Sequence, residues 1–395
     1  MSSYNQRLIT FFILILNMPA VLCVDEHAPS LPAMTGFFGT LPSSMQLTIS
    51  FYMLGMALSQ WFAGILSDRF GRRPILFSSA LIFFIASLVC TYTSSAPILL
   101  MGRFFQGVGM GCFAMISPAL MGDALEKTRL HRVSAYFSMC YSLIPILAPV
   151  IGGYIQDWIG WRGNFGFMFL FTLIIAIIAF FKLPETHTPT EEHRLFLSKI
   201  LRNNKTVLTT RAYILPVAGM TILWSMIIVF SVMAPYILQT NLHLSATEYG
   251  YCALLVGIGI LIGNYFNTLL HKTFPVERII FLGVTAMLLI SLIQLCVLLF
   301  TPLHILTLMV PILLLMIANG IIFPSYYAIA ASVFTNLVGI ASSLIGCLIL
   351  IGTVICTAIM AQLNAHSPLL LSAVYVALSA LCFLINLSRR RSNKL

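Results

Sequence analysis

Charged residues are scarce in this sequence. Only 8% of its 395 residues are Asp, Glu, Lys or Arg, whereas a typical soluble domain carries about 25%. Hydrophobic residues make up 59%, and the mean hydropathy is +0.99. This number of charged residues is too small to build a water-facing surface. We therefore expect the chain to be surrounded by lipid.

Motifs for chemistry are scarce as well. The nine cysteines lie within or at the edge of apolar segments and form no CxxC pair, which argues against disulfides and a metal site. The sequence has no G-x-S-x-G, HExxH or P-loop motif. We therefore expect neither enzyme activity nor a cofactor.

Long apolar runs are abundant instead. Each is close to the roughly 20 residues that one helical membrane crossing needs. The runs are continuous rather than alternating, which excludes a closed β-barrel. We predict an all-α membrane protein with twelve transmembrane helices, at residues 8–28, 44–66, 74–93, 97–121, 131–154, 164–183, 212–239, 246–270, 277–300, 303–330, 335–361 and 367–387.

The net charge of +10 could suggest a nucleic-acid partner, but its distribution argues against one. Nineteen of the 21 Lys and Arg residues lie in alternate loops or at the two termini. The exceptions are Arg103, inside a predicted span, and Arg162, in an opposite loop. By the positive-inside rule, both termini face the cytoplasm, and the expected partner is the lipid bilayer.

The longest polar segment, 184–211, divides the spans six and six. We predict an N-terminal six-helix half at 1–183, a cytoplasmic linker at 184–211 and a C-terminal six-helix half at 212–395. Two related bundles around a central cavity are typical of secondary transporters. Within the linker, residues 191–206 form either an amphipathic surface helix or a solvated connection.

Ionisable residues at membrane depth occur only in the first half, where they are Asp25, Glu26 and Arg103. Buried charge is costly in lipid and usually functional, so we assign proton coupling to these three residues. The polar residues inside the second half are uncharged: Gln239, Asn264, Asn267, Gln294 and Asn319.

Arg103 and Asp25 are predicted to lie at similar depth. Counted at 1.5 Å per residue, Arg103 lies about 9 Å below one face and Asp25 about 25 Å above the other. In a core about 30 Å thick these depths coincide, so an ion pair is expected. If Asp25 and Arg103 move apart, the Asp25 carboxylate is expected to take up a proton more readily. Two alternatives remain: the pair is static and only joins the two spans, or the carboxylate of Asp25 or Glu26 extends to the membrane interface. His27 either packs or titrates.

The loop at 64–74, GILSDRFGRRP, joins two spans with no room for a domain. Its glycines allow a tight turn and close backbone approach, and Asp68 among three arginines can anchor helix ends. A positively charged loop without further role is the alternative. We predict a cytoplasmic gate made of Gly64, Asp68, Arg69, Gly71, Arg72 and Arg73.

This loop resembles the segment between helices 2 and 3 of major facilitator superfamily transporters, G-x-L-x-D-R-x-G-R-R. Other segments resemble the bicyclomycin/chloramphenicol resistance-type (Bcr/CflA-like) drug:proton antiporters: 23–32 (CVDEHAPSLP), 103–107 (RFFQG), 148–153 (APVIGG), 160–165 (GWRGNF) and 183–186 (LPET). The resemblance is dense in the first half and loose in the second. It implies the twelve-helix facilitator fold, with Asp25 as the acidic residue of span 1 and Arg103 as the functional arginine of span 4.

One motif departs from that family. The antiporter pattern of span 5 is G-x-x-x-G-P-x-x-G-G, and here Ile144 and Ala148 replace the first two glycines. Ala148 is still small enough for close packing, but Ile144 is not, which weakens the inference of export direction. The predicted helix-packing motif is Ala148, Pro149, Gly152 and Gly153.

Aromatic, Met and Asn residues are candidates to line a substrate cavity, where flexible and stacking side chains give broad selectivity. Lipid-facing or core packing is the alternative for each. The candidates are Tyr52, Met110, Phe113, Tyr141, Trp224, Phe230, Tyr236, Tyr251, Asn264, Asn319, Phe323 and Tyr327.

These observations together predict a proton-coupled transporter of the bacterial inner membrane. As a monomer, it would export small lipophilic or drug-like compounds in exchange for protons. Two alternatives keep the same fold: a dedicated metabolite or siderophore exporter, and an importer. A membrane sensor or assembly protein without transport activity is a third.

Overall fold

The computed structural model describes residues 3–125, 127–186, 204–334, 338–363 and 366–392. It describes their side chains except at 3–7, 61, 65, 127–128, 131, 135, 138, 140–142, 338–339 and 391–392. The chain divides into two compact units, Met1–Phe196 and Leu197–Leu395. The predicted limits of the halves and linker stay a prediction, and residues 191–203 of the predicted surface helix lie outside the described residues.

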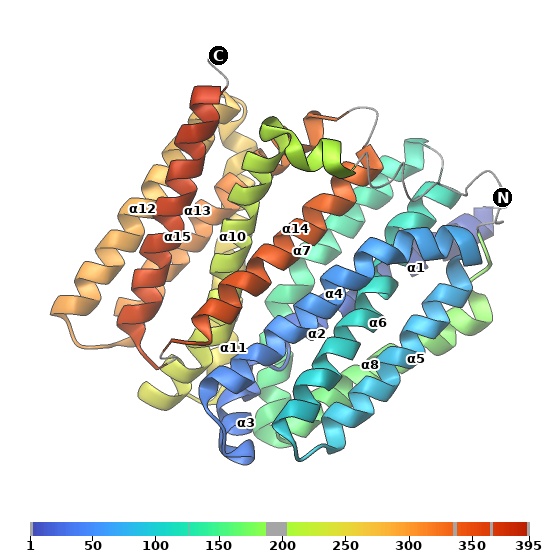
Figure 1. Ribbon diagram of the computed structural model, residues 1–395, viewed down its shortest axis with the longest axis horizontal. Coiled ribbons are helices and arrows are strands. Elements are labelled where there is room, and N and C mark those ends of the chain that lie inside the picture. The colour runs from blue at the N-terminus through green and yellow to red at the C-terminus, as the bar shows by residue number, and fades with distance from the viewer. Residues whose placement is uncertain (1–2, 126, 187–203, 335–337, 364–365, 393–395) are drawn as a thin grey trace. The chain divides into compact units, whose positions relative to one another are not determined.

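The N-terminal unit consists of helices (Figure 1): α1 (Ser3–Leu16), α2 (Met18–Asp25), η1 (Ala28–Ser30), α3 (Leu31–Phe38), α4 (Pro42–Phe70), α5 (Arg72–Tyr92), α6 (Ala96–Ala124), α7 (Lys127–Trp158) and α8 (Trp161–Lys182). Helix α6 packs against both α4 and α5, and α5 packs against α8. Gly107 of α6 lies directly against the backbone of α4 at Tyr52, where no larger residue would fit. Helix α6 also packs against α1 and α2, which belong to the first span.

The C-terminal unit is also helical: α10 (Arg211–Tyr236), η3 (Ile237–Asn241), α11 (Ala246–Leu270), α12 (Val276–Phe300), α13 (Ile305–Ser332), α14 (Val338–Met360) and α15 (Pro368–Ser392). Helix α13 packs against α11 and α12, and α10 packs against α13, α14 and α15. The five residues of η3 form a π-helical turn that continues α10.

Ten helical segments among the described residues are long and apolar enough to cross a membrane. Helix α4, bent by 42° between Pro42–Gln60 and Phe62–Phe70, makes an eleventh if it counts as one span. The remaining predicted span, 131–154, lies within the 32-residue helix α7. Each predicted span therefore has a helix at its place.

The first span is longer than predicted and is interrupted. Its apolar run extends from Leu8 to Phe38, so the predicted end at residue 28 is wrong. Pro19, Pro29 and Pro32 each stand in the first turn of a new helical segment, because proline lacks the N–H that would continue the preceding one. Residues 25–27 consequently lie inside the run, at a break between α2 and η1.

Candidate functional site

Arg103 of α6 is buried at the break in the first span, with 1% of its surface exposed. Its Nη2 donates to the Cys23 carbonyl at 3.0 Å, and its Nη1 contacts the Cys23 Sγ at 3.3 Å. Nη1 also donates to Gln106 Oε1 at 2.9 Å, and Nε donates to the Thr48 carbonyl at 3.3 Å. Arg103 thereby joins α2, α4 and α6.

Aromatic rings complete the surroundings of the Arg103 guanidinium. It lies 4.4 Å from the ring centre of Tyr52 and 5.9 Å from that of Phe165. The electron-rich faces of such rings attract cations. The Tyr52 hydroxyl donates to the Ala20 carbonyl at 2.8 Å, which fixes its ring beside Arg103.

Arg103 also occupies the end of α2, where the last carbonyls have no partner within the helix. One of these, the Cys23 carbonyl, takes the guanidinium, and a cation is also favoured at the negative end of a helix dipole. The backbone carbonyl of Cys23 is thus one partner of Arg103, and the predicted match in depth and ion pair with Asp25 stay predictions.

Two carboxylates are buried beside this contact, with Asp25 7% and Glu26 1% exposed. The charge of Arg103 acts on Glu26. Among the described residues, Glu26 Oε1 has no hydrogen-bond partner. An acidic oxygen without a partner near a guanidinium is suited to bind and release a proton.

His27 is fixed by Thr48. The Thr48 hydroxyl donates its one hydrogen to the Met45 carbonyl at 2.5 Å, so its contact with His27 Nε2 at 3.0 Å requires the imidazole to donate. This arrangement assigns the proton to Nε2 and leaves Nδ1 as an acceptor. Sequence reasoning missed Thr48, because nothing marks a threonine that holds both His27 and Arg103.

The predicted helix-packing motif lies against the same break. Ala148, Pro149, Gly152 and Gly153 are all buried. Gly152 faces the Glu26 carbonyl so closely that an added Cβ would overlap it. Helix α7 therefore approaches the first span at the residue whose carboxylate lies near Arg103.

A second cluster, at the start of α5, surrounds Arg72, which is 5% exposed. Its Nε and Nη2 donate to the Asp123 carboxylate at 2.8 and 3.3 Å, and its Nη1 donates to Asp68 Oδ1 and Ser67 Oγ, both at 2.6 Å. The forked contact with Asp123 is the strong form of an arginine–carboxylate pair. Sequence reasoning missed Asp123, although it is the lone acidic residue in the last turn of α6.

Glu185, which follows α8, caps the N-terminus of α5. Its two carboxylate oxygens accept from the backbone N–H groups of Arg72 and Arg73 at 2.9 and 3.0 Å. A negative charge at the positive end of a helix is stabilising. Gly71, with φ +93°, makes the turn, and a Cβ there would lie 3.0 Å from Glu185 Oε2. The tight turn predicted at Gly71 is thus present.

Two residues of the predicted gate lie outside this cluster. A Cβ added at Gly64 would meet nothing within 4 Å, and the role of Gly64 in a gate stays a prediction. Arg69 is exposed and lies over the Phe70 ring at 5.2 Å. Arg73 donates to the Phe180 carbonyl at 2.8 Å, which joins the loop to α8.

The cavity candidates are divided between the two units. Tyr52, Met110 and Phe113 are fully buried in the N-terminal unit. In the C-terminal unit, Asn319 is buried and donates to the Leu223 carbonyl at 2.8 Å, so its amide has a structural use. Two further candidates of this unit are buried, Phe230 and Tyr236. Three are half-buried: Trp224, Asn264 and Phe323. Two are exposed: Tyr251 and Tyr327. The side chain of Tyr141 lies outside the described residues.

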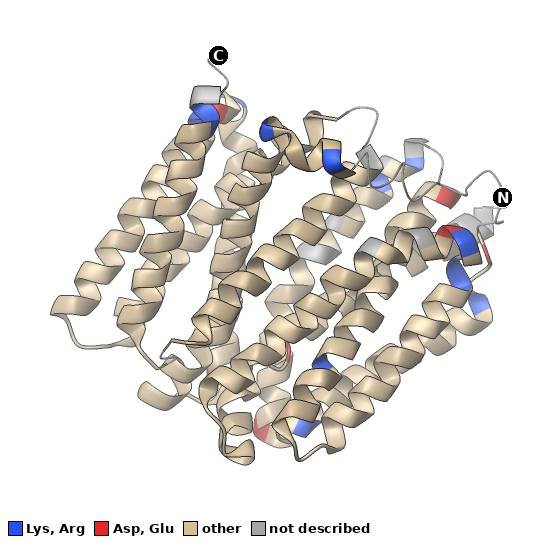
Figure 2. Cartoon of the chain, viewed as in Figure 1, with Lys and Arg blue, Asp and Glu red and all other residues tan. Residues whose placement is uncertain are grey.

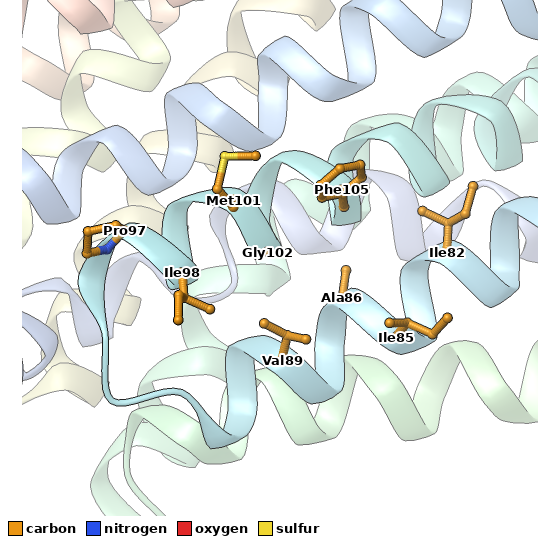
Figure 3. Close-up of a pocket in the computed structure, with 9 residues that line it drawn as sticks. All are labelled: Ile82, Ile85, Ala86, Val89, Pro97, Ile98, Met101, Gly102 and Phe105. Atoms are coloured by element: carbon orange, nitrogen blue, oxygen red, sulfur yellow. The ribbon is translucent and has the colours of Figure 1, made fainter.

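A groove of about 550 Å³ lies between α5 and α6 (Figure 3). Its lining is apolar, and none of the residues predicted for the cavity contributes to it. Much of its wall is exposed, including Ile85 at 57% and Ile98 at 51%. The groove therefore offers a ligand no polar side chain among its lining residues. The lining residues are Ile82, Ile85, Ala86, Val89, Pro97, Ile98, Met101, Gly102 and Phe105.

Apolar helices of membrane length, with a few charged side chains buried among them, define a multi-pass helical membrane protein. Figure 2 shows the Lys and Arg residues of each unit gathered mainly at one end, as the positive-inside rule expects of cytoplasmic loops. A family model described as Major Facilitator Superfamily matches residues 9–348. The chain belongs to this superfamily.

Relatives agree with this assignment. Multidrug resistance protein MdtL of Escherichia coli is 29% identical over 259 residues, which are 65% of this chain and 65% of that protein. The protein of the same name from Citrobacter koseri is 29% identical over 256 residues, 65% of this chain and 64% of that one. The match spans just under two thirds of the length of these relatives.

Solved structures show the same fold. The crystal structure of a D-xylose–proton symporter has a TM-score of 0.78 at 15% identity, with 96% of each chain covered. A POT family transporter in complex with 5-aminolevulinic acid has a TM-score of 0.75 at 13% identity, covering 96% of this chain and 94% of that one. The predicted fold of two helical bundles is confirmed.

Proposed function

We propose that this chain is a proton-coupled transporter that exports small, lipophilic or drug-like compounds across the bacterial inner membrane. The observation that carries the proposal is the buried cluster of Arg103 with Asp25 and Glu26. Ionisable groups inside a membrane span are costly and mark ion pathways. The names of the Escherichia coli and Citrobacter koseri relatives support drug-like substrates. The proposed partners are protons, the substrate and the bilayer, and the proposed working form is a monomer.

The proposed coupling uses the break in the first span. Arg103 is held by the end of α2, so a change of angle at residues 26–27 alters its distance from the Glu26 carboxylate, whereas Asp25 moves with α2. A carboxyl group in a membrane binds a proton more readily as a cation moves away. One proton moved across 100 mV supplies roughly 2.3 kcal/mol, enough for about fiftyfold accumulation of a substrate.

Two further roles belong to the proposal. The Arg72 cluster acts as a latch at the cytoplasmic end, because its ion pairs join α4, α5 and α6. The aromatic and Met candidates named above line the cavity in which the substrate binds. The substrate and the proton then move in opposite directions, because one binding site opens alternately to the two sides of the membrane.

The test is proton release from proteoliposomes on addition of chloramphenicol as the probe. We expect release by the wild type and its loss in Asp25→Asn or in Glu26→Gln. The control is Asp157→Asn, which removes an exposed acid near the end of α7. Unchanged release in both carboxylate variants would exclude these residues from coupling. In whole cells, an uncoupler raises accumulation of a substrate that is exported and lowers it for a proton-driven importer.

A further inference from the structure

Three arginines are buried in the described part of the chain: Arg72, Arg103 and Arg389, with 5%, 1% and 3% of their surface exposed. Arg72 has two carboxylate partners, and Arg103 makes four hydrogen bonds. Arg389, in the last turns of α15, makes one long hydrogen bond, from Nη2 to Asn386 Oδ1 at 3.4 Å. Its charge is therefore the least compensated of the three.

The polar atoms left over at this place are all donors. Arg389 Nε, Arg389 Nη1 and Asn386 Nδ2 are buried, and none has a hydrogen-bond partner among the described residues. Arg389 and Asn386 are three residues apart on α15, so both side chains lie on one helix face. A buried cation without a counter-charge is strongly unfavourable, and a set made only of N–H groups is matched by an anion.

The neighbouring charges do not supply that anion. Glu277 of α12 acts on Arg389 from a distance, but it is exposed and forms no ion pair with it among the described residues. Arg390 adds a second positive charge, with its guanidinium 4.2 Å from the Phe281 ring centre. Tyr326 of α13 is fully buried within electrostatic range of Arg389, and its hydroxyl also contacts the Cys382 Sγ at 4.0 Å.

The position of Arg389 indicates which anion is available. Residues 389–394 carry four of the positive charges that place this end of the chain at the cytoplasmic face. Long cationic side chains near helix ends reach the layer of lipid headgroups. Basic sites between helices on the cytoplasmic side are suited to anionic headgroups.

We propose that Arg389, Asn386 and Tyr326, here called the Arg389 site, bind a phosphate group at the cytoplasmic end of the C-terminal unit. The phosphodiester of an anionic lipid and free inorganic phosphate share this chemistry. Either would accept hydrogen bonds from the guanidinium and amide and supply the missing negative charge. The site lies in the C-terminal unit, so it is independent of the proton site around Arg103.

The experiment measures the melting temperature of the purified full-length protein in detergent. Short-chain phosphatidylglycerol, short-chain phosphatidylcholine and inorganic phosphate are titrated separately. We expect phosphatidylglycerol to raise the melting temperature more than phosphatidylcholine does, since a ligand bound only by the folded state stabilises it. Arg389→Gln weakens the apparent affinity at least about tenfold, a loss of roughly 1.4 kcal/mol. Arg278→Gln removes the same charge from an exposed position of α12 and leaves the affinity unchanged.

If Arg389→Gln does not fold, the variant Asn386→Asp tests whether the Arg389 site binds a phosphate group. The new carboxylate lies one turn from Arg389 and replaces the anion from within the chain. We expect it to raise the melting temperature without lipid and to abolish the response to phosphatidylglycerol. An equal rise with inorganic phosphate alone assigns the site to the free ion. A wild-type response in Arg389→Gln or Asn386→Asp overturns the proposal, and so does a protein that responds to inorganic phosphate not at all and to the two lipids equally.

Discussion

Arg103 receives its acceptors from the end of α2, where the Cys23 carbonyl has no partner within the helix. A guanidinium with donors on three sides can serve a carbonyl, a side-chain amide and a second backbone segment together. Glu26 lies within reach of the same charge. At the residue scale, the buried arginine therefore stabilises the break in the span and also influences the carboxylate next to it.

Thr48 is expected to position His27 and Arg103 through separate atoms. Its hydroxyl receives the His27 hydrogen bond, whereas its backbone carbonyl receives Arg103. Thr48→Val leaves the buried His27 N–H without a partner, which costs about 1–3 kcal/mol of stability. Thr48→Ser keeps the hydroxyl and should restore most of it. Melting temperatures of the two variants check this, and equal stability would show that the contact contributes nothing.

Gly152 should be intolerant of any side chain. Gly152→Ala places a Cβ on the Glu26 carbonyl, and the overpacking costs about 1–3 kcal/mol or forces α7 away from the first span. The control is Gly166→Ala in α8, because a Cβ there meets nothing within 4 Å. Yield of folded protein and melting temperature are the measurements. A Gly152→Ala variant as stable as Gly166→Ala would contradict the close packing.

At the scale of elements, the Arg72 cluster connects four parts of the chain. Asp68 belongs to α4, Asp123 to α6, and Glu185 follows α8, while Arg72 begins α5. Its partners differ in exposure, with 37% for the Asp68 side chain and 20% for Asp123. The contact with Asp68 is the more exposed of the two, so it is the easier one to break and remake in the proposed transport cycle.

Asp68→Asn is expected to slow turnover more than it weakens substrate binding. The amide keeps an acceptor for Arg72 but loses the charge, while Asp123 still holds the guanidinium. We expect kcat to fall by roughly tenfold with KM unchanged, because gating steps often limit kcat. Transport rates at varied substrate concentration in proteoliposomes measure both. Equal turnover in the variant would refute a latch at this residue.

The sequence predicted the place of each span, because continuous apolar runs depend only on composition and length. It could not predict where the first span breaks, since Pro19, Pro29 and Pro32 are tolerated in membrane helices with or without a break. The contact of Arg103 with the Cys23 carbonyl follows from that break, and charge and depth alone do not reveal it. Asp123 and Thr48 were missed because their roles depend on contacts between helices distant in sequence.

At the scale of the whole molecule, the two units differ in how buried charge is distributed. The N-terminal unit buries Asp25, Glu26, Arg72 and Arg103, and the C-terminal unit buries Arg389 near one end. Proton coupling and anion binding are thus proposed for separate units. Variants in one unit should leave the proposed activity of the other measurable.

The topology gives a direct test of orientation. A fluorescent protein fused after Leu395 should fold and fluoresce, because it folds in the cytoplasm. Alkaline phosphatase inserted between Thr93 and Ser95, in the turn between α5 and α6, should be active because it requires the periplasm. Whole-cell fluorescence and phosphatase activity are the measurements. The opposite pair of results would invert the orientation derived from the positive charges.

The contact of Glu185 with the start of α5 has a consequence for synthesis of the chain. Arg72 leaves the ribosome long before Asp123, and both precede Glu185. The cluster therefore stays incomplete while the first spans are inserted, and it closes only when α8 is in place. Glu185 precedes every helix of the C-terminal unit, so the N-terminal unit can be completed and fastened while the other half is still being translated.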